Sequence, residues 1–286
     1  MAIVLGPNRY GKAETRLVRV FRDDDTHRLA DFNVSIALSG DLAAAHLTGD
    51  NAGVLPTDTM KNTVYAFAKE YGVGEPEEFG LLLAMHFVAT QPPVRAAKVA
   101  IESFRWDRLG PHSFRRSADY VRTAAVTVTI DQQQVVSGLR DLVLLNSAGS
   151  EFRGFPRDKY TTLPETDDRI LATAVDAKWR HSATDADWYE SFHGAVDALT
   201  KGFVNTYSAS LQQTLFAMGS HVLETRPEIA EVRLALPNRH HYLVDLSPFD
   251  LTNDNEVFLA GDRPYGLIEG TVARDDAPEA HAEWYL

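Results

Sequence analysis

The fold of this chain is read most directly from the stretch Val54-Leu55-Pro56-Thr57-Asp58-Thr59-Met60-Lys61-Asn62-Thr63. The proline ring disfavours a helical residue before it, so Leu55 is expected to be extended. Thr57 or Asp58 can then act as the N-cap, whose side-chain oxygen accepts a hydrogen bond from a free backbone N–H. Apolar residues follow at helical spacing, at Met60, Val64, Phe67 and Ala68. The stretch therefore predicts the start of an amphipathic helix.

The start of this helix also offers groups that can bind a ligand. Unpaired N–H groups and the positive end of the helix dipole favour a negatively charged partner there. Thr57, Asp58 and Asn62 add a hydroxyl, a carboxylate and an amide close to that end. An ordinary capped helix fits the same pattern, so the stretch alone leaves both interpretations open.

Two strands are predicted before this helix, and a second helix and two more strands after it. The run Arg16–Arg22 reads as a strand, and Phe32–Leu38 alternates apolar and polar residues as a half-buried strand does. The second helix is expected to begin near Pro76, since proline suits the first helical position. Alternation then predicts strands around residues 98–102 and 126–130.

The second half of the chain repeats this order of elements. Strands are expected at Val135–Leu145 and Ile170–Trp179, then helices with apolar faces from Trp188 to Phe203 and from Leu211 to Val222. Two strands, Val232–Leu236 and Tyr242–Leu246, are expected to close the pattern. Each half thus reads strand, strand, helix, helix, strand, strand, which indicates duplication.

This repeat predicts an α+β protein with two tandem domains. We expect the first domain to span residues 1–133 and the second to span residues 134–286, the latter ending in an acidic tail after Arg274. The sheets should be antiparallel, with the helices on one face only.

The composition is that of an ordinary globular protein, with 44% hydrophobic and 24% charged residues among 286. The 28 Lys and Arg against 40 Asp and Glu give a formal charge of −12. This balance argues against a nucleic-acid partner, which requires a basic face. It still permits a small anionic substrate, because a few nearby cations outweigh the global charge at short range.

The absence of cysteine excludes disulfides, thiolate metal sites and cysteine nucleophiles. No apolar run reaches the length of a membrane-spanning helix, so no membrane partner is expected. The first residues, Met1–Pro7, lack the charged region of a signal peptide, and the C-terminus Glu283–Leu286 differs from a peroxisomal address. A cytoplasmic location is therefore expected.

Short polar stretches stand at the ends of the predicted elements, where functional groups are usually presented. They are Tyr10-Gly11-Lys12, Thr57-Asp58, the block from Phe152 to Arg169, Ser208-Ala209-Ser210-Leu211-Gln212, and Leu236-Pro237-Asn238-Arg239-His240-His241-Tyr242. In this order and at these intervals, they resemble the signatures of the urate oxidase (uricase) family. The likeness runs over nearly the whole chain, and five collinear motifs are far more specific than one.

The resemblance implies a fold and an activity. Members of that family have the tunnelling fold, in which each half is the ββααββ unit predicted above, and they assemble as homotetramers that enclose a β-barrel tunnel, with active sites at subunit interfaces. The implied reaction is the oxidation of urate by O2 and water to 5-hydroxyisourate and hydrogen peroxide in purine catabolism, without cofactor or metal.

The resemblance also implies which residues bind the substrate. Arg169 corresponds to the family's clamp, since a guanidinium can give two parallel hydrogen bonds to the edge of a flat anion. Gln212 pairs with the opposite edge, the backbone N–H of Leu211 meets a carbonyl, and Phe152 stacks on the purine face. Thr57 and Asp58 contact the substrate from the neighbouring subunit, and Asn238 holds O2 or water over the ring with Thr57.

The implied proton chemistry falls to Lys12, Thr57 and His240. An amine can take a proton from urate, a hydroxyl can both donate and accept, and an imidazole can reset the relay. In isolation each of these residues also reads as an ordinary one: a surface lysine, a capping threonine and a satisfied core histidine.

Two alternative functions differ from this one in the residues that they require. A pterin- or purine-acting hydrolase or aldolase of the same fold would need a cluster of metal ligands, and adjacent His240 and His241 on a strand would face opposite ways. No phosphate-binding loop, dinucleotide fingerprint or nucleophile elbow is found. A non-catalytic purine-binding protein remains the other alternative, but it would be expected to lack Lys12, Thr57 or His240.

Overall fold

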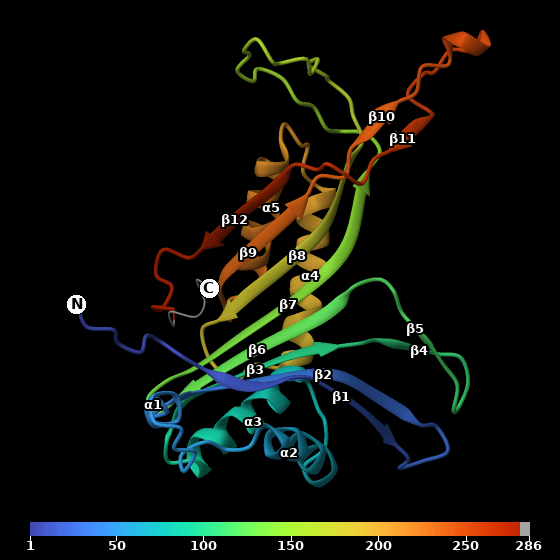
Figure 1. Cartoon of the computed structure of the whole chain (residues 1–286). Helices are drawn as coiled ribbons and strands as arrows, with labels where there is room; N and C mark the ends of the chain where they lie inside the picture. Colours follow the sequence, from blue (N-terminus) through green and yellow to red (C-terminus); the bar gives the residue numbers. More distant parts are fainter. Residues whose placement is uncertain (281–286) are drawn as a thin grey trace. The chain divides into compact units, whose positions relative to one another are not determined.

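The computed structural model describes residues 1–280 of the chain (Figure 1). The C-terminal stretch Glu283–Leu286, used above to argue against a peroxisomal address, lies outside the described residues. Two compact units are present. The first comprises residues 1–138, 180–190 and the segment from Pro278, and the second comprises residues 139–179 and 191–277.

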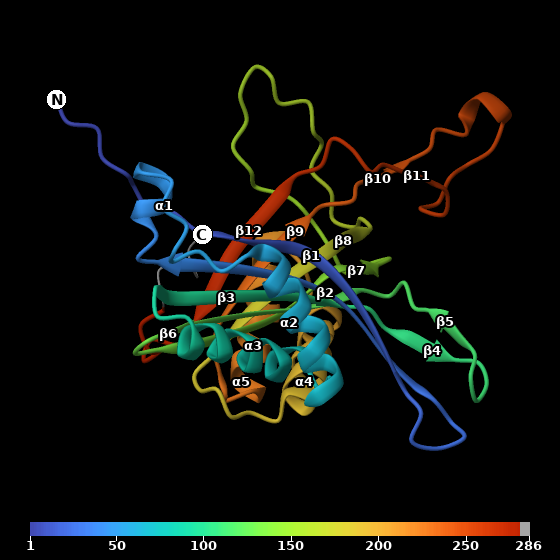
Figure 2. The ribbon, with the colours of Figure 1, turned by 60° about the horizontal axis from the view of Figure 1, so that its bottom comes forward.

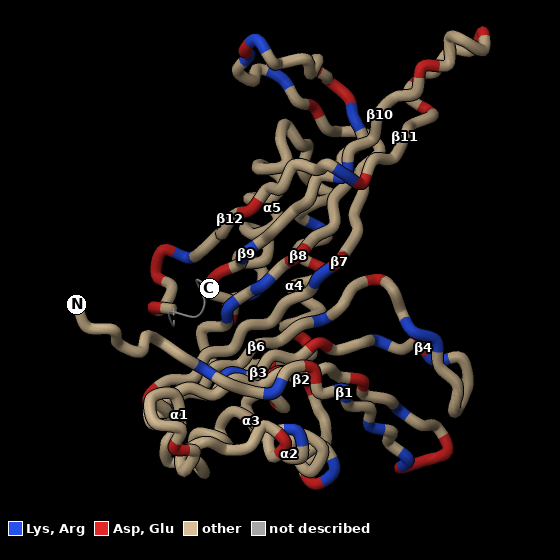
Figure 3. Tube along the Cα trace, viewed as in Figure 1, with Lys and Arg blue, Asp and Glu red and all other residues tan. Residues whose placement is uncertain are grey.

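The first unit contains an antiparallel sheet in the order β1-β2-β3-β6. Its strands are β1 (Tyr10–Phe21), β2 (Arg28–Gly40), β3 (Val94–Ser103) and β6 (Val121–Thr129). The alternation seen in the sequence decides which face is buried, since Val34, Ile36 and Leu38 are all in the core. Acidic and basic residues are both present along the strands of this unit (Figure 3).

Two long helices, α2 (Thr57–Glu70) and α3 (Pro76–Thr90), cover the buried face of this sheet (Figure 2). Both begin where the sequence predicted. Pro76 is the first residue of α3, and Glu75 and Glu78 form a capping box around it. Gly80 lets α3 approach the sheet closely, because a Cβ there would meet the side chain of Val126 at 2.9 Å.

A buried polar cluster joins α3 to the strands of the first unit. Glu77 is fully buried, and its carboxylate accepts hydrogen bonds from Arg122 (2.7 Å) and from the Ser137 hydroxyl (2.5 Å). Arg122 also pairs with Glu75 at 2.5 Å, and the Ser137 hydroxyl lies 2.9 Å from Nε2 of His181. Burial raises the pKa of Glu77, an effect that the Arg122 charge opposes.

The second unit contains the strand order β7-β8-β9-β12. These strands are β7 (Gln133–Asn146), which begins in the first unit, β8 (Leu171–His181), β9 (Ile229–Pro237) and β12 (Leu267–Ala273). The helices are α4 (Trp188–Val204) and α5 (Leu211–Thr225), and α5 packs on β9 and β12. The α+β prediction, with helices beside antiparallel strands, is confirmed.

The prediction that Tyr242–Leu246 closes the second sheet is wrong. The closing strand is β12, which pairs antiparallel with β9. Residues 241–243 form β10 (His241–Leu243), which pairs with β11 (Phe258–Ala260) in a separate hairpin that extends beyond the sheet (Figure 1). Tyr242 and Leu243 are exposed there, whereas Val272 of β12 is buried.

The shape of α5 explains why β12 takes this place. Gly270 leaves room for Leu215, since a Cβ at Gly270 would lie 2.9 Å from that leucine's side chain. Gly219 in turn accommodates Val272, with a hypothetical Cβ 2.6 Å from the valine. Such steric matching between strand and helix does not appear in the alternation of a single segment.

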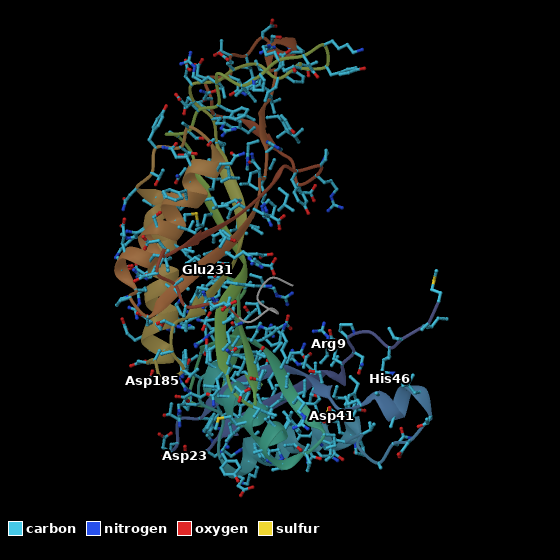
Figure 4. The ribbon with its side chains drawn as sticks, turned by 90° about the vertical axis from the view of Figure 1, so that its left-hand side faces the viewer. Arg9, Asp23, Asp41, His46, Asp185 and Glu231 are labelled. Atoms are coloured by element: carbon cyan, nitrogen blue, oxygen red, sulfur yellow. The ribbon has the colours of Figure 1, made fainter. Side chains whose placement is uncertain are left out.

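Other short elements were not predicted. They are α1 (Ala43–Leu47), the hairpin of β4 (Trp106–Arg108) and β5 (Phe114–Arg116), and the 3-10 turn η1 (Ser247–Phe249). Figure 4 shows Asp41 and His46 in the excursion that carries the chain from β2 to α2. Arg95 holds the start of this excursion, because its Nε and Nη2 donate to Asp41 at 3.1 and 2.7 Å. None of the helices in the described residues is long and apolar enough to cross a membrane.

Candidate active site

Lys12 lies at an irregularity in β1 of the first unit. It pairs with Ile36 of β2, and the register then shifts between Lys12 and Thr15. Glu14 adopts a left-handed conformation with φ of 56°, and its N–H donates to the Ser35 hydroxyl at 2.9 Å. Bulges of this kind re-aim neighbouring side chains and are common beside active sites. The bulge therefore sets the direction of the half-buried Lys12 side chain.

We expect Gly11→Ala to disturb this end of β1. A methyl group at Gly11 would overlap the carbonyl oxygen of Ile36, which is backbone and cannot turn away. Overpacking typically costs about 1–3 kcal/mol, and the strand must shift at the residue before Lys12. The unfolding temperature and kcat should both fall. Gly6→Ala is the control, since a Cβ at Gly6 meets no atom within 4 Å; equal behaviour of the two variants would contradict the prediction.

The N-cap of α2 differs from the prediction. Pro56 occupies the cap position and has no side-chain hydrogen bond to offer, and Thr57 is the first helical residue. Neither Thr57 nor Asp58 is the cap. The carbonyl of Pro56 accepts the first hydrogen bond of the helix, from Thr59 N at 2.9 Å. As a result the partly exposed Thr57 hydroxyl has no hydrogen bond among residues 1–280.

Asp58 is held by its own helix. Lys61 Nζ lies 2.6 Å from Oδ1, and Asn62 Nδ2 donates to Oδ2 at 2.9 Å. The hydrogen bond and charge of Lys61 lower the pKa of Asp58, and Lys12 adds a smaller effect of the same sign. Lys12 is thus within electrostatic range of Asp58 in the first unit. Lys61 and Asn62, which lie one turn further along α2, thus orient the carboxylate.

Arg169 and Phe152 lie together in the second unit. The Cζ atom of Arg169 is 5.2 Å from the centre of the Phe152 ring. Phe152 also stacks on Phe155, with ring centres 4.9 Å apart and an interplanar angle of 13°. Burial lowers the pKa of Arg169, though an arginine keeps its charge. A cation beside a fixed aromatic ring suits a flat anionic ligand.

The loop between these two residues is closed at its base. Phe152 and Thr166 exchange backbone hydrogen bonds at 2.9 and 3.2 Å. The loop carries charges of both signs (Figure 3), and Arg153 pairs with Asp167 at 2.5 Å. Asp167 is thus paired with Arg153, whereas the Arg169 side chain donates to the Ser150 hydroxyl.

Leu211 and Gln212 open α5. Ser210 is the N-cap, and its hydroxyl accepts from Gln213 N at 3.2 Å. The Gln213 side chain returns to Ala209 N at 2.9 Å. Because Gln213 makes the capping contact, the exposed Gln212 amide and the Leu211 N–H at the first helical position are available to a ligand.

Asn238 and His240 follow β9. Asn238 N donates to Gly266 O at 2.8 Å, and Asn238 forms a bridge with Thr173 of β8. His240 is partly buried outside a strand, so the expectation that it points opposite to His241 on one strand does not apply. Burial, followed by the charges of Arg169 and His241, lowers the pKa of His240. The imidazole is thus close enough to Arg169 to feel its charge, and it is kept neutral near pH 7.

The chain matches known proteins over most of its length. The family model described as Uricase matches residues 8–127 and 135–269, which is most of the chain. The chain belongs to the uricase family.

Curated relatives support this membership. The uricase of Arthrobacter globiformis is 50% identical over 99% of this chain and 94% of its own length. The uricase of Dictyostelium discoideum is 39% identical over 93% of this chain and 96% of its own length. A crystal structure of the Arthrobacter globiformis uricase superposes with a TM-score of 0.97 at 49% identity, covering 100% of both chains. The tandem tunnelling fold implied by the resemblance is therefore confirmed, with the family model matching once in each half.

The nine site residues expected from the resemblance to uricases fall into two groups. Lys12, Thr57 and Asp58 belong to the first unit, where the charge of Lys12 contributes to lowering the pKa of Asp58. The other six belong to the second unit, where Arg169 lies beside Phe152 and His240; they are Phe152, Arg169, Leu211, Gln212, Asn238 and His240. Among residues 1–280, no group of three or more His, Cys, Asp or Glu side chains is arranged to hold a metal.

Sequence reasoning missed residues that position this set. Ser150 contacts the Arg169 guanidinium, and Phe155 stacks against Phe152. Tyr10 donates to Leu55 O at 3.1 Å and so joins β1 to the start of α2. Both serine and phenylalanine lie within or next to the quoted motif block, so proximity to the motif was the available signal.

Proposed function

We propose that this chain catalyses the oxidation of urate by O2 and water to 5-hydroxyisourate and hydrogen peroxide. The observation that carries the proposal is the Arg169 guanidinium beside the Phe152 ring, at 5.2 Å, in a chain of the uricase family. An aromatic ring and a guanidinium together select a flat, anionic heterocycle with acceptors along one edge. Urate has this chemistry.

In this proposal the second unit binds the substrate. Arg169 donates to a carbonyl and a ring nitrogen at one edge, while Gln212 and the Leu211 N–H meet the other edge. Phe152 stacks on the ring, and Asn238 holds O2 or water over it. The capping contact of Gln213 supports the role of Gln212, because it leaves the Gln212 amide available.

The proton chemistry is shared between Lys12 and Thr57 of the first unit and His240 of the second unit. Lys12 takes a proton from urate through the Thr57 hydroxyl, and neutral His240 completes the relay. The Thr57 hydroxyl suits this role since the fold does not use it as a cap. We propose that Thr57 and Asp58 reach the substrate from a neighbouring subunit, which requires an oligomer, and that this oligomer is a homotetramer.

The activity has a direct test. Protein treated with a chelator is mixed with urate in air, and the loss of the purine's ultraviolet absorbance is followed together with peroxide formation. We expect one peroxide for each urate consumed. Absence of decay, or decay that requires added metal, would reject the proposal. Xanthine, which lacks the 8-carbonyl of urate, is the control substrate and should not be consumed.

We also propose that the two repeats meet between residues 133 and 134, that the chain forms a homotetramer, and that it is located in the cytoplasm. The repeat boundary between residues 133 and 134 is tested by expressing each half alone. The homotetramer is tested by light scattering, and activity that survives full dissociation would show that the site is not shared. The cytoplasmic location is tested by cell fractionation.

A further inference from the structure

We propose that Ser150 is a positioning residue that fixes the Arg169 guanidinium and reserves its two terminal nitrogens for the substrate. This inference rests on the proposed function and concerns how the clamp of that site is aimed. Ser150 was not among the residues expected from the sequence, and its side chain is fully buried.

Two hydrogen bonds join Ser150 to Arg169. The backbone N–H of Arg169 donates to the Ser150 carbonyl at 3.0 Å, and Arg169 Nε donates to the Ser150 hydroxyl at 3.1 Å. The backbone bond sets where the side chain starts, and the bond to Nε sets the rotation of the guanidinium plane. A planar guanidinium held at Nε and at Cα has little freedom left.

The bond to Nε also decides which donors face the ligand. A guanidinium can bind a planar partner through Nε and one terminal nitrogen, or through both terminal nitrogens. Ser150 occupies Nε, and Nη1 and Nη2 have no hydrogen bond among the described residues 1–280. The end-on pair is therefore the fork that Arg169 presents to substrate.

Ser150 is itself tied to the helix that carries the opposite edge of the site. It forms a parallel bridge with Ser208, in which Glu151 N donates to Ser208 O at 2.9 Å and Ser208 N donates to Gly149 O at 3.0 Å. The buried Ser208 hydroxyl accepts from Thr214 of α5 at 2.8 Å.

One continuous network thus runs from the Arg169 guanidinium to the helix that begins with Leu211 and Gln212. Ser150 links the two parts of this network, because its hydroxyl contacts the guanidinium and its backbone forms the bridge with Ser208. The separation between the arginine fork and the amide edge is set by this network, and that separation must match the width of one purine. Misplacement of a binding group by about 1 Å can lower a rate by roughly 10²-fold.

The test compares Ser150→Ala with Ser191→Ala. Ser191 is also a buried serine of the second unit, and its hydroxyl donates to Glu228 at 2.7 Å away from Arg169. Both variants lose one buried hydrogen bond, so both should lower the unfolding temperature. Only Ser150→Ala should raise the Kd of urate, measured without oxygen, by roughly 5- to 50-fold, as expected for a lost bond to a charged group. KM should rise with Kd, and kcat at saturation should change less.

Two further variants separate positioning from packing. Ser150→Cys keeps the volume of the side chain but replaces the hydroxyl with a poor acceptor, so Kd should rise nearly as much as in Ser150→Ala. In an Arg169→Lys background, which has no Nε to hold, adding Ser150→Ala should leave Kd unchanged. A wild-type Kd in Ser150→Ala, or an equal rise with and without the arginine, would overturn the inference. If wild-type protein neither binds nor oxidises urate, the proposed function fails instead.

Discussion

Lys12→Met should lower kcat for urate by roughly 10²–10⁴-fold, the usual contribution of a positioned general base. The variant keeps the length and much of the volume of the side chain but has no amine to take a proton. The β1 bulge, which Glu14 and Ser35 hold, does not depend on the lysine head group. Binding of urate without oxygen should therefore largely persist, and the loss should appear in turnover of bound substrate.

Lys201→Met is the matched control for this experiment. Lys201 lies on the exposed side of α4 and pairs with Asp197 at 2.6 Å, so its removal should leave kcat and KM unchanged. A Lys12→Met variant with wild-type kcat and a strongly raised Kd would mean that Lys12 clamps the substrate and does not act as a base.

Arg122→Met should destabilise the fold by about 3–5 kcal/mol at neutral pH, the range for breaking a buried ion pair from one side. Without Arg122, the fully buried Glu77 carboxylate loses its charged partner and keeps the hydrogen bond from the Ser137 hydroxyl. Chemical denaturation at fixed protein concentration measures the change. Arg115→Met is the control, because the Arg115 pair with Asp107 is long, at 3.4 Å, and largely exposed on the arginine side.

The effect of Arg122→Met should depend on pH in a defined direction. Burial already raises the pKa of Glu77, and removing the opposing Arg122 charge raises it further. A carboxyl group whose pKa is raised by folding binds more protons in the folded state than in the unfolded state. Its ionised form therefore destabilises the fold at pH values above the folded-state pKa, and this destabilisation fades as the pH falls through that pKa. The stability gap to wild type should thus shrink toward acid pH.

The double variant Glu77→Gln/Arg122→Met removes the buried carboxylate charge that Arg122 no longer balances. It should recover most of the lost folding stability at neutral pH. A gap that stays constant with pH, or a double variant less stable than Arg122→Met alone, would show that packing and not the carboxylate charge causes the effect.

Much of the site was predictable because its motifs are contiguous. Thr57 and Asp58 at a helix start, and Leu211 and Gln212 at another, follow from local rules of capping and apolar spacing. The position of the N-cap of α2 differs from the prediction for a local reason as well. Pro56 serves as the cap residue without a side-chain hydrogen bond, so the hydroxyl of Thr57 is not used as a cap.

The partners of the site residues could not be predicted, because they are distant along the chain. Ser150 and Arg169 are 19 residues apart, and nothing in a serine at that spacing indicates a bond to Nε. Likewise the Tyr10 hydroxyl reaches the Leu55 carbonyl across 45 residues, and the packing of α2 on β1 accompanies this contact.

The sequence by itself determined the order of the long helices and of the long strands as far as β9, their apolar faces, and the family, since periodicity and motif spacing are properties of the chain alone. Only the tertiary structure decided which strand closes the second sheet. The alternation of Tyr242, Val244 and Leu246 fits a strand wherever it lies, whereas β12 is selected by its pairing with β9 and by the fit of Gly270 and Val272 against α5. The same holds for the aim of Arg169, because a hydrogen bond between distant residues exists only once the fold has placed them together.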